Sequence, residues 1–579
     1  MITIVRTVKS DSSINCDNWA MNSVIYYHPE AYTTSGPKLM GRNAAGESFL
    51  RGYLSYSTAT TFWAQVQKPE HGQHFAAQVK AQGRTESVHA VTAHNLSALS
   101  QAGLVYHPGP GIGQHAFHRS VAAGSHAAWS LCGITHTTSS AGAMDAISEL
   151  ITAPVQAWDA VICTSTAVKD NVSKLLQAQV NMLQERLGIS KLVLPMLPVI
   201  PLGIHTQDFV FTDAQKNAAR QTLKANDNTL VVLFMGRLSF HAKAHPLAMY
   251  QALQMAAHKL KAAGKKIKLV ECGWHANEFI EKAYRDAALQ ACPDVEVITL
   301  DGRKAEDRET AWAGADVFCS LSDNIQETFG IVPIEAMAAG LPVVVSDWDG
   351  YKDTVRHEVD GFRINTTMPE AGLATDLALR HALEIDTYDM YCGHTCSLVS
   401  VDIDQAAHAF VKLFESPSLR QTMGAAGRQR AQEVYDWKVI IAQYEALWAE
   451  QQSVRLASLA NTATPPVKLA HPWPARMDPF YAFANYPTQA LTAHTVLCLT
   501  DANLEAASKR IQTYQGMAMV SFAKWVLPSD AEIAAVLKQA SNGPQAALDL
   551  VMHIEDARKP FVFRTLAWLL KLGIFKVQS

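Results

Sequence analysis

Two glutamates, Glu327 and Glu335, are separated by seven residues in the stretch ETFGIVPIEAMAAGLPVV. A buried strand, DVFCSLS, precedes this stretch, and a helix is expected from about residue 329 to residue 339, because Gly and then Pro follow it. The first turn of such a helix offers unpaired N–H groups and a partial positive charge, which suit a phosphate. The two carboxylates can accept hydrogen bonds from hydroxyl groups at both ends of one elongated ligand. A nucleotide sugar has these parts in this order.

Two cations follow another predicted strand of the same region. Arg237 and Lys243 lie in GRLSFHAK, directly after NTLVVLFM. Two fixed cations at the C-terminal edge of a strand can neutralise a diphosphate leaving group. Asp323 and Asn324 precede Glu327 and have two interpretations, as contacts to the ligand or as caps of the loop.

The N-terminal part of the chain has weaker candidates. The loop SGPKLMGRNAAGESF supplies Gly36, Gly41 and Arg42 just before a predicted helix, which is a second loop suited to an anion. His136, in GITHTTSS, follows a predicted strand. A lone histidine there is usually structural, but this one would lie at the sheet edge that faces the ligand.

Composition limits the class of protein. The chain has 579 residues, 48% of them hydrophobic and 18% charged, which is enough for two to four globular domains. The net charge of -4 gives no global argument for nucleic acid as a partner. The opening residues, MITIVRTVKSDSS, lack a signal-peptide pattern and are expected to form a first strand, and scattered cysteines favour a reducing cytoplasm. Cys392 and Cys396 have no second cysteine pair, so we expect a loop there and no metal site.

Strand-like and helix-like runs alternate over most of the chain, which predicts α/β architecture with parallel sheets. We place an N-terminal domain at residues 1–205 and a second one, with a closing helix, at 206–453. A Pro-rich linker is expected at 454–478, and a small, mainly helical domain at 479–579. Three short helices in this last domain are similar to a winged-helix module.

Together these motifs resemble the retaining glycosyltransferases of the GT-B fold, in glycosyltransferase family 4 or glycosyl transferases group 1. The resemblance covers roughly residues 1–453. It is carried by ETFGIVPIEAMAAGLPVV with Glu327 and Glu335, GRL…K with Arg237 and Lys243, THT with His136, ICTS, PLGI and the Trp437 helix YDWKVIIAQYEALW.

The resemblance implies two Rossmann-like domains that face each other across a cleft, with the nucleotide sugar in the C-terminal domain and the acceptor in the N-terminal domain. Glu335 would bind the ribose. Glu327 and the backbone at Phe329, Gly330 and Ile331 would hold sugar hydroxyls and phosphate.

The remaining implied roles concern the departing diphosphate and the reacting carbon. Arg237 and Lys243 would stabilise the diphosphate, His136 would contact the donor sugar near the reacting carbon, and Gly41 and Arg42 would lie near the donor. Such enzymes retain the anomeric configuration and generally need no metal or other cofactor. UDP-sugars are favoured as donors because they are frequent in the family, and the acceptor is left open.

This sequence departs from the family pattern at two of these places. The spacing from Arg237 to Lys243 is one residue longer than usual, and no Gly follows the lysine, which puts the role of Lys243 in doubt. The N-terminal loop reads GPKLMG instead of a plain Gly-Gly, so the glycine that meets the ligand is open.

Two alternatives stay open. HPGPGIGQH, residues 107–115, is a weak dinucleotide pattern that lacks full spacing and a clear following helix, so an oxidoreductase is a distant alternative. A GT-B scaffold without activity that binds a partner through its C-terminal module is another. That module, which ends in KPFVFRTLAWLLKLGIF, can pack on the transferase, contact another protein or lie on a membrane surface.

Overall fold

The computed structural model describes residues 22–33, 41–460 and 471–578, with the side chains of Gly41 and Arg42 excepted. The strand expected at residues 2–8 lies outside the described residues. The chain divides into two compact units, residues 1–473 and 474–579, which are described separately below.

The first unit contains two parallel sheets of six strands each, with orders β3-β2-β1-β4-β5-β6 and β12-β11-β10-β7-β8-β9. Counted from its own first strand, each sheet has the Rossmann order 3-2-1-4-5-6. The first contains β1 Val24–Tyr27, β2 Thr61–Val66, β3 Ser87–Val91, β4 Leu104–Tyr106, β5 Ser130–Ile134 and β6 Ala160–Ile162. The second contains β7 Thr229–Met235, β8 Lys266–Gly273, β9 Glu296–Asp301, β10 Val317–Ser320, β11 Val343–Ser346 and β12 Gly361–Ile364. The predicted α/β class with two Rossmann-like domains is confirmed.

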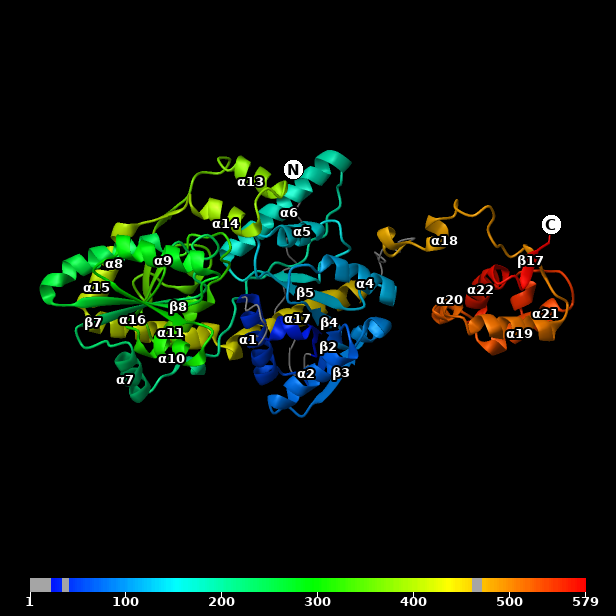
Figure 1. Cartoon of the computed structure of the whole chain (residues 1–579), viewed down its shortest axis with the longest axis horizontal. Helices are drawn as coiled ribbons and strands as arrows, with labels where there is room; N and C mark the ends of the chain where they lie inside the picture. Colours follow the sequence, from blue (N-terminus) through cyan, green and yellow to red (C-terminus); the bar gives the residue numbers. More distant parts are fainter. Residues whose placement is uncertain (1–21, 34–40, 461–470, 579) are drawn as a thin grey trace. The chain divides into compact units, whose positions relative to one another are not determined.

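Helices cover both faces of each sheet, as the continuous apolar sequence of strands such as β7 requires. One face of the first sheet packs on α1 Gly41–Tyr56, α2 Pro69–Ala81 and α17 Trp437–Ala460; the other packs on α4 Gly113–Ala123, α5 Ala141–Glu149 and α6 Thr166–Leu187. One face of the second sheet packs on α10 Ala305–Gly314 and α11 Ile331–Ala338; the other packs on α8 Leu247–Leu260, α9 Glu278–Ala291 and α15 Ile403–Glu415 (Figure 1).

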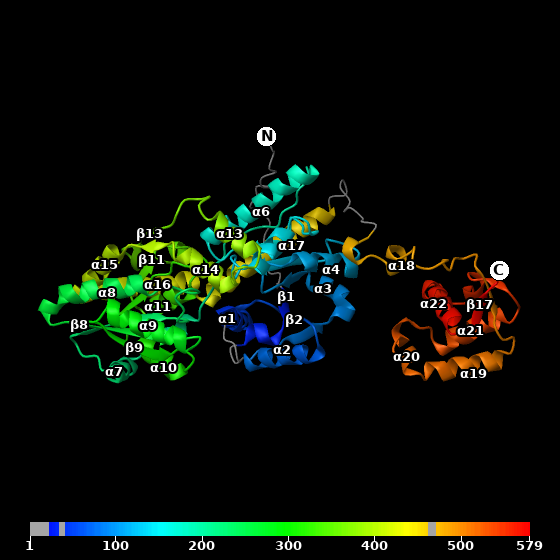
Figure 2. The same ribbon diagram turned by 45° about the horizontal axis from the view of Figure 1, so that its top comes forward.

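The closing helix α17 packs against the first sheet, although the sequence placed it with the second domain. In both views it runs beside the strands of the first sheet (Figures 1 and 2). Trp437, in its first turn, is buried and donates a hydrogen bond from its indole N–H to Ser48 Oγ at 2.7 Å. Gly52 and Gly203 lie against the same ring, where a Cβ would overlap it. The apolar face of the helix finds its partner only in the tertiary fold, and one core cluster therefore extends through both domains.

Two local predictions are wrong. The glycine-rich stretch from residue 107 does lead into a helix, because α4 begins at Gly113. Cys392 and Cys396 lie on a helix, α14 Tyr388–Cys396, not in a loop. With α13 Thr375–Ala382, this helix belongs to an insertion between β12 and α15, and a short antiparallel pair, β13 Thr366–Thr367 with β14 Ser400–Val401, closes its base.

The second unit combines helices with a small antiparallel sheet. The helices are α18 Pro479–Ala482, α19 Leu504–Gln515, α20 Ala518–Ser521, α21 Asp530–Ala540 and α22 Lys559–Lys571. The sheet has the order β16-β15-β17, with β15 Val496–Leu499, β16 Gln545–Ala546 and β17 Phe575–Val577. Where a second of three helices was predicted, the chain instead forms β16 and a single helical turn at Asp549–Val551.

Candidate active site

Glu327 lies in the loop that leaves β10, and α11 begins four residues later at Ile331. The helix was expected from residue 329, but Gly330 adopts a left-handed conformation with φ +81° and delays its start. A side chain at Gly330 would also overlap the ring of Tyr351, so glycine is required there. The side chain of Phe329 is buried in the core, and only its backbone can reach a ligand. The first N–H groups of α11 are unpaired within the helix, and the predicted phosphate contact to them stays a prediction.

Glu327 forms an ion pair with Lys243, with 2.6 Å between Oε2 and Nζ. The exposed fractions are 10% for the Glu327 side chain and 24% for the Lys243 side chain. Burial raises the pKa of Glu327, but the charge and hydrogen bond of Lys243 outweigh it, and the pKa is lowered from its ordinary value. Both groups therefore meet as ions at the carboxyl edge of the second sheet.

The loop that carries Arg237 and Lys243 is held by the residues before Glu327. Asn324 donates from its side-chain amide to the carbonyl of His241 at 3.1 Å, and Asp323 accepts from the backbone N–H of His245 at 3.2 Å. Arg237 donates to the carbonyl of Ala242 at 2.8 Å, which bends the loop back on itself. Asp323 and Asn324 are thus loop caps, the second of their two interpretations.

Glu335 lies about one turn into α11 and lines a cavity of about 460 Å³. The walls of this cavity include Met235 at the end of β7, and Arg308 and Trp312 of α10. Burial raises the pKa of Glu335 to about 7, and the positive charge of Arg308 limits the rise. A cavity of this size beside α11 can take a nucleoside.

The first domain reaches this site mainly through backbone and hydroxyl groups. The carbonyl of His136 accepts a hydrogen bond from Thr328 Oγ1 at 3.2 Å, so the loop after β5 lies against the Glu327 loop. In the same loop, Ser139 Oγ lies 3.2 Å from the hydroxyl of Tyr388 of α14. Gly41 and Arg42 form the first turn of α1, and the Arg42 side chain lies outside the described part. Their predicted role stays a prediction.

Two residues at this site were not recognised from the sequence. Tyr351 packs against Gly330, and its hydroxyl donates to Glu327 Oε2 at 3.5 Å. Asp349 has a left-handed backbone with φ 42°, rare for a residue other than glycine, and accepts a hydrogen bond from Ser165 of the first domain at 3.2 Å. The only signal in the sequence was their position after a predicted strand.

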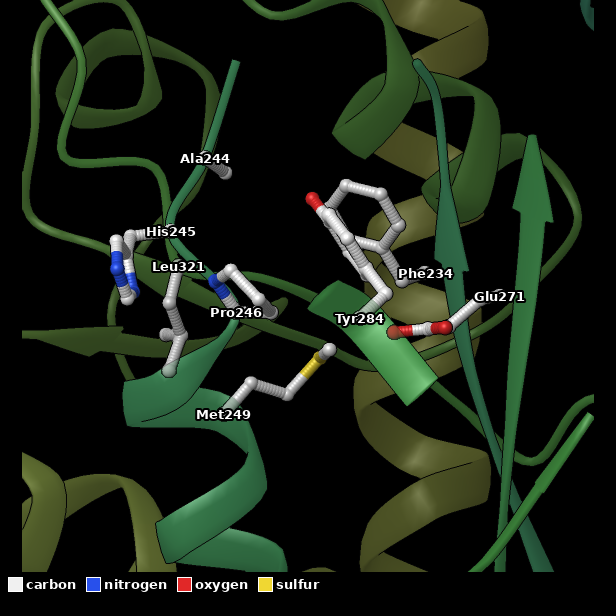
Figure 3. Close-up of a pocket in the computed structure, with 8 residues that line it drawn as sticks. All are labelled: Phe234, Ala244, His245, Pro246, Met249, Glu271, Tyr284 and Leu321. Atoms are coloured by element: carbon white, nitrogen blue, oxygen red, sulfur yellow. The ribbon is translucent and has the colours of Figure 1, made fainter. Parts of the chain in front are cut away.

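A second, much smaller pocket lies behind the Lys243 loop, on the opposite face of β7 (Figure 3). Figure 3 shows Glu271 and Tyr284 across from Met249 and Pro246. Burial raises the pKa of Glu271 to about 7, although the Tyr250 hydroxyl donates to it at 2.5 Å. With a volume of about 10 Å³ the pocket holds at most a water molecule, which excludes it as the donor site.

Residues 215–377 match the family described as Glycosyl transferases group 1, a range that contains Arg237, Lys243, Glu327 and Glu335. The matched range lies within the second domain. Among the described residues, there is no cluster of three or more His, Cys, Asp or Glu side chains placed to hold a metal ion. No helix in the described ranges is long and apolar enough to cross a membrane.

The chain is also similar to characterised and uncharacterised glycosyltransferases. It is 29% identical over 154 residues to an uncharacterized glycosyltransferase of Methanocaldococcus jannaschii, covering 26% of this chain and 36% of that protein. It is 30% identical over 155 residues to the phosphatidyl-myo-inositol mannosyltransferase of Mycobacterium tuberculosis, covering 26% and 32%. The chain thus spans about a third of the length of these curated relatives. The Anabaena protein HepE, solved in complex with UDP, is 15% identical with a TM-score of 0.47, over 74% of this chain and 100% of HepE.

Proposed function

We propose that this chain is a retaining hexosyltransferase that moves a sugar from a nucleotide-sugar donor to an acceptor, without a resident cofactor or metal. One observation carries the proposal: the Lys243–Glu327 ion pair lies beside the first turn of α11. Lys243 shares its loop with Arg237. Both charges face a site that a sugar diphosphate would fill. A UDP-sugar is the favoured donor, on its prevalence in the family alone.

The cations and the helix start would stabilise the leaving group. As the sugar–phosphate bond breaks, negative charge grows on the diphosphate. Lys243 and Arg237 would meet that charge as fixed cations, and the N–H groups of Gly330 and Ile331 would bind phosphate oxygens. This charge stabilisation needs no rearrangement, because Asn324 and Asp323 already hold the loop.

The two glutamates would bind the donor at different points. Glu327, kept ionised by Lys243, would accept hydrogen bonds from hydroxyl groups of the transferred sugar. Glu335, in the cavity next to Arg308, would accept from the ribose hydroxyl pair. These contacts would fix the anomeric carbon between α11 and the His136 loop of the first domain.

In the proposed reaction the bond from the anomeric carbon to the diphosphate oxygen breaks with oxocarbenium character. The acceptor hydroxyl attacks from the same face, and its proton passes to the departing diphosphate. His136 would contact the sugar near the reacting carbon. The protein contributes orientation and charge, not a covalent nucleophile. Trapping a glycosyl-enzyme adduct would contradict this mechanism.

We place the reaction in the cytoplasm, in the synthesis of a glycan or glycoconjugate. The Mycobacterium tuberculosis relative is named a phosphatidyl-myo-inositol mannosyltransferase, and a lipid-linked acceptor is one option for this chain. A small metabolite and a peptide are the others. The second unit would serve as a contact to a membrane surface or to another protein, and not to nucleic acid.

The deciding experiment is hydrolysis of a panel of nucleotide sugars without acceptor, read as released nucleoside diphosphate. We expect release from one donor by the full chain and its loss in Glu327→Ala. Ser140→Ala, at the start of α5 in the first domain, serves as a matched control. If no donor is turned over and calorimetry shows no nucleotide binding, the catalytic proposal fails and the binding-scaffold alternative takes its place. A nicotinamide titration separately tests the oxidoreductase alternative.

A further inference from the structure

The segment 517–526 of the second unit, MAMVSFAKWV, presents large apolar side chains to solvent. It connects α19 to α21 and contains the short helix α20 and a helical turn at Lys524–Val526. Met519 is 78% exposed, Phe522 79% and Trp525 82%. Their spacing of three residues brings them to a similar side of consecutive helical turns. Exposed patches of this kind mark contact sites in soluble domains.

These side chains lie outside the core of their own unit. The core of the second unit is built from β15, α19, α21, α22 and their neighbours, and it includes no residue between Ile511 and Ile533. The segment is nevertheless ordered by its own backbone hydrogen bonds, such as Phe522 N–H to Ala518 O at 3.2 Å. A hydrogen bond from Gln515 to Asp530, 3.2 Å long, joins its two ends. The segment therefore has a defined backbone structure, and its large apolar side chains are exposed.

The charged side chains between residues 506 and 529 are all basic, and Asp530 follows directly. From residue 506 to residue 529 the sequence contains no Asp or Glu, whereas Lys509, Arg510 and Lys524 all lie in this range. Lys509 and Lys524 are exposed, and Arg510 donates a hydrogen bond to the carbonyl of Gly573. A partner that complements this region must offer apolar volume together with negative charge.

We propose that the 517–526 segment docks the chain on an anionic lipid surface. Met519, Phe522 and Trp525 would enter the boundary between head groups and acyl chains, where aromatic residues are favoured, while Lys509 and Lys524 meet the head groups. A fluid bilayer can take up these exposed side chains without a shaped pocket. The inference stands independently of the proposed transferase activity, since it uses no residue of the first unit.

The test is co-sedimentation of the full chain with vesicles of phosphatidylcholine, with and without phosphatidylglycerol. We expect binding to the anionic vesicles that weakens with added salt. Replacing the three apolar residues together (Met519→Ser, Phe522→Ser and Trp525→Ser) should lower the partition coefficient by about tenfold or more. Replacing Lys509 and Lys524 by Gln should lower it roughly fivefold for each lysine.

The matched control is Leu548→Ser with Met552→Ser, two residues of the same unit that are 45% and 52% exposed and lie outside the segment. This control should bind vesicles like the unmodified chain. The proposal is overturned if the unmodified chain does not bind anionic vesicles, if the triple variant binds as well as it does, or if the control loses as much. Light scattering adds one more check: conversion of a dimer to a monomer by the triple variant, without vesicle binding, would make the segment a protein interface. Donor hydrolysis, measured separately, reports on the transferase proposal alone.

Discussion

Each domain of the first unit contains a short ion pair whose side chains have little solvent exposure. The two pairs differ in how many of their hydrogen-bonding positions are occupied. In the first domain Arg119 and Asp159 form a bidentate pair with both side chains fully buried. Asp159 also accepts from the backbone N–H groups of Leu131 and Gln156, so its oxygens are fully used. In the second domain Lys243 and Glu327 are partly exposed at the sheet edge. In the first pair the Asp159 carboxylate is fully used and only Arg119 Nε is left without a partner among the described residues, whereas the second pair lies partly open to solvent.

The difference suggests that charge alone does not identify a functional site. A buried pair with all its lone pairs occupied stabilises one arrangement of the chain and has no capacity left for chemistry. A pair at the carboxyl edge of a parallel sheet, next to a helix start, has its remaining capacity directed at solvent. Separate effects on stability and on turnover should therefore distinguish the two pairs.

The largest expected effect is a loss of protein stability when the first-domain ion pair is broken. Asp159→Asn leaves Arg119 buried without its counter-ion, and we expect the free energy of unfolding to fall by about 3–5 kcal/mol. Denaturant unfolding followed by tryptophan fluorescence measures this loss. Donor turnover per folded molecule, at a temperature where the variant is folded, should stay unchanged. A selective loss of turnover would contradict the structural role.

For the second-domain pair we expect a large loss of donor turnover and little change in stability. Glu327→Gln keeps the shape of the side chain but removes its charge, and donor turnover should fall by about 10²–10³-fold. The unfolding midpoint should change little, because Lys243 is a quarter exposed and can be hydrated. Turnover equal to that of the unmodified chain would remove Glu327 from the site.

A smaller effect is expected on donor affinity when the pH is changed, because the protonation of Glu335 changes with it. Burial raises its pKa to about 7 from an ordinary value of 4.5, so it becomes protonated as the pH falls below 7 and loses acceptor capacity. Donor affinity should then fall by up to about tenfold per pH unit below 7. Calorimetric titration of the nucleotide at a series of pH values measures this slope, and Glu335→Gln should abolish it.

The same carboxyl also gives a stability prediction with a definite sign. Because the pKa in the folded state lies above the ordinary value, folding favours the protonated form, and stability is lost as the pH rises from about 4.5 through about 7. Glu335→Gln should therefore raise the melting temperature at pH 8 relative to the unmodified chain, and not at pH 4. An equal shift at both pH values would point to packing instead of charge.

The smallest effect concerns the contact between the domains at α14. Tyr388→Phe removes a hydroxyl that lies 3.2 Å from Ser139 Oγ and 3.4 Å from Thr137 Oγ1. A loss of about 1 kcal/mol corresponds to roughly a fivefold lower kcat/KM for the donor. Tyr391→Phe, on the same helix but stacked on His381, is the matched control and should behave like the unmodified chain. Equal losses in both variants would assign the effect to helix packing.

Local patterns in the sequence were sufficient to predict much of the secondary structure of the second domain. The apolar runs predicted β7 and β10, and Gly340 before Pro342 predicted the end of α11, because these signals act over a few residues. The pairing of Lys243 with Glu327 could not be predicted, since it depends on a loop that Asn324 fixes from another strand. Cys392 and Cys396 were assigned to a loop because short helices without an amphipathic pattern give a weak signal.

The sequence by itself determined the chemical groups of this protein and their order along the chain: two carboxylates around a helix start and two cations after a strand. It also determined that parallel sheets would carry them, because alternating apolar strands and helices bury well only in that architecture. Only the tertiary structure decided which groups meet. Lys243 neutralises Glu327, Tyr351 adds a second hydrogen bond, α17 returns to the first sheet, and Glu335 is left in a cavity that raises its pKa. Such pairings depend on distances between residues far apart in sequence, which local propensity does not encode.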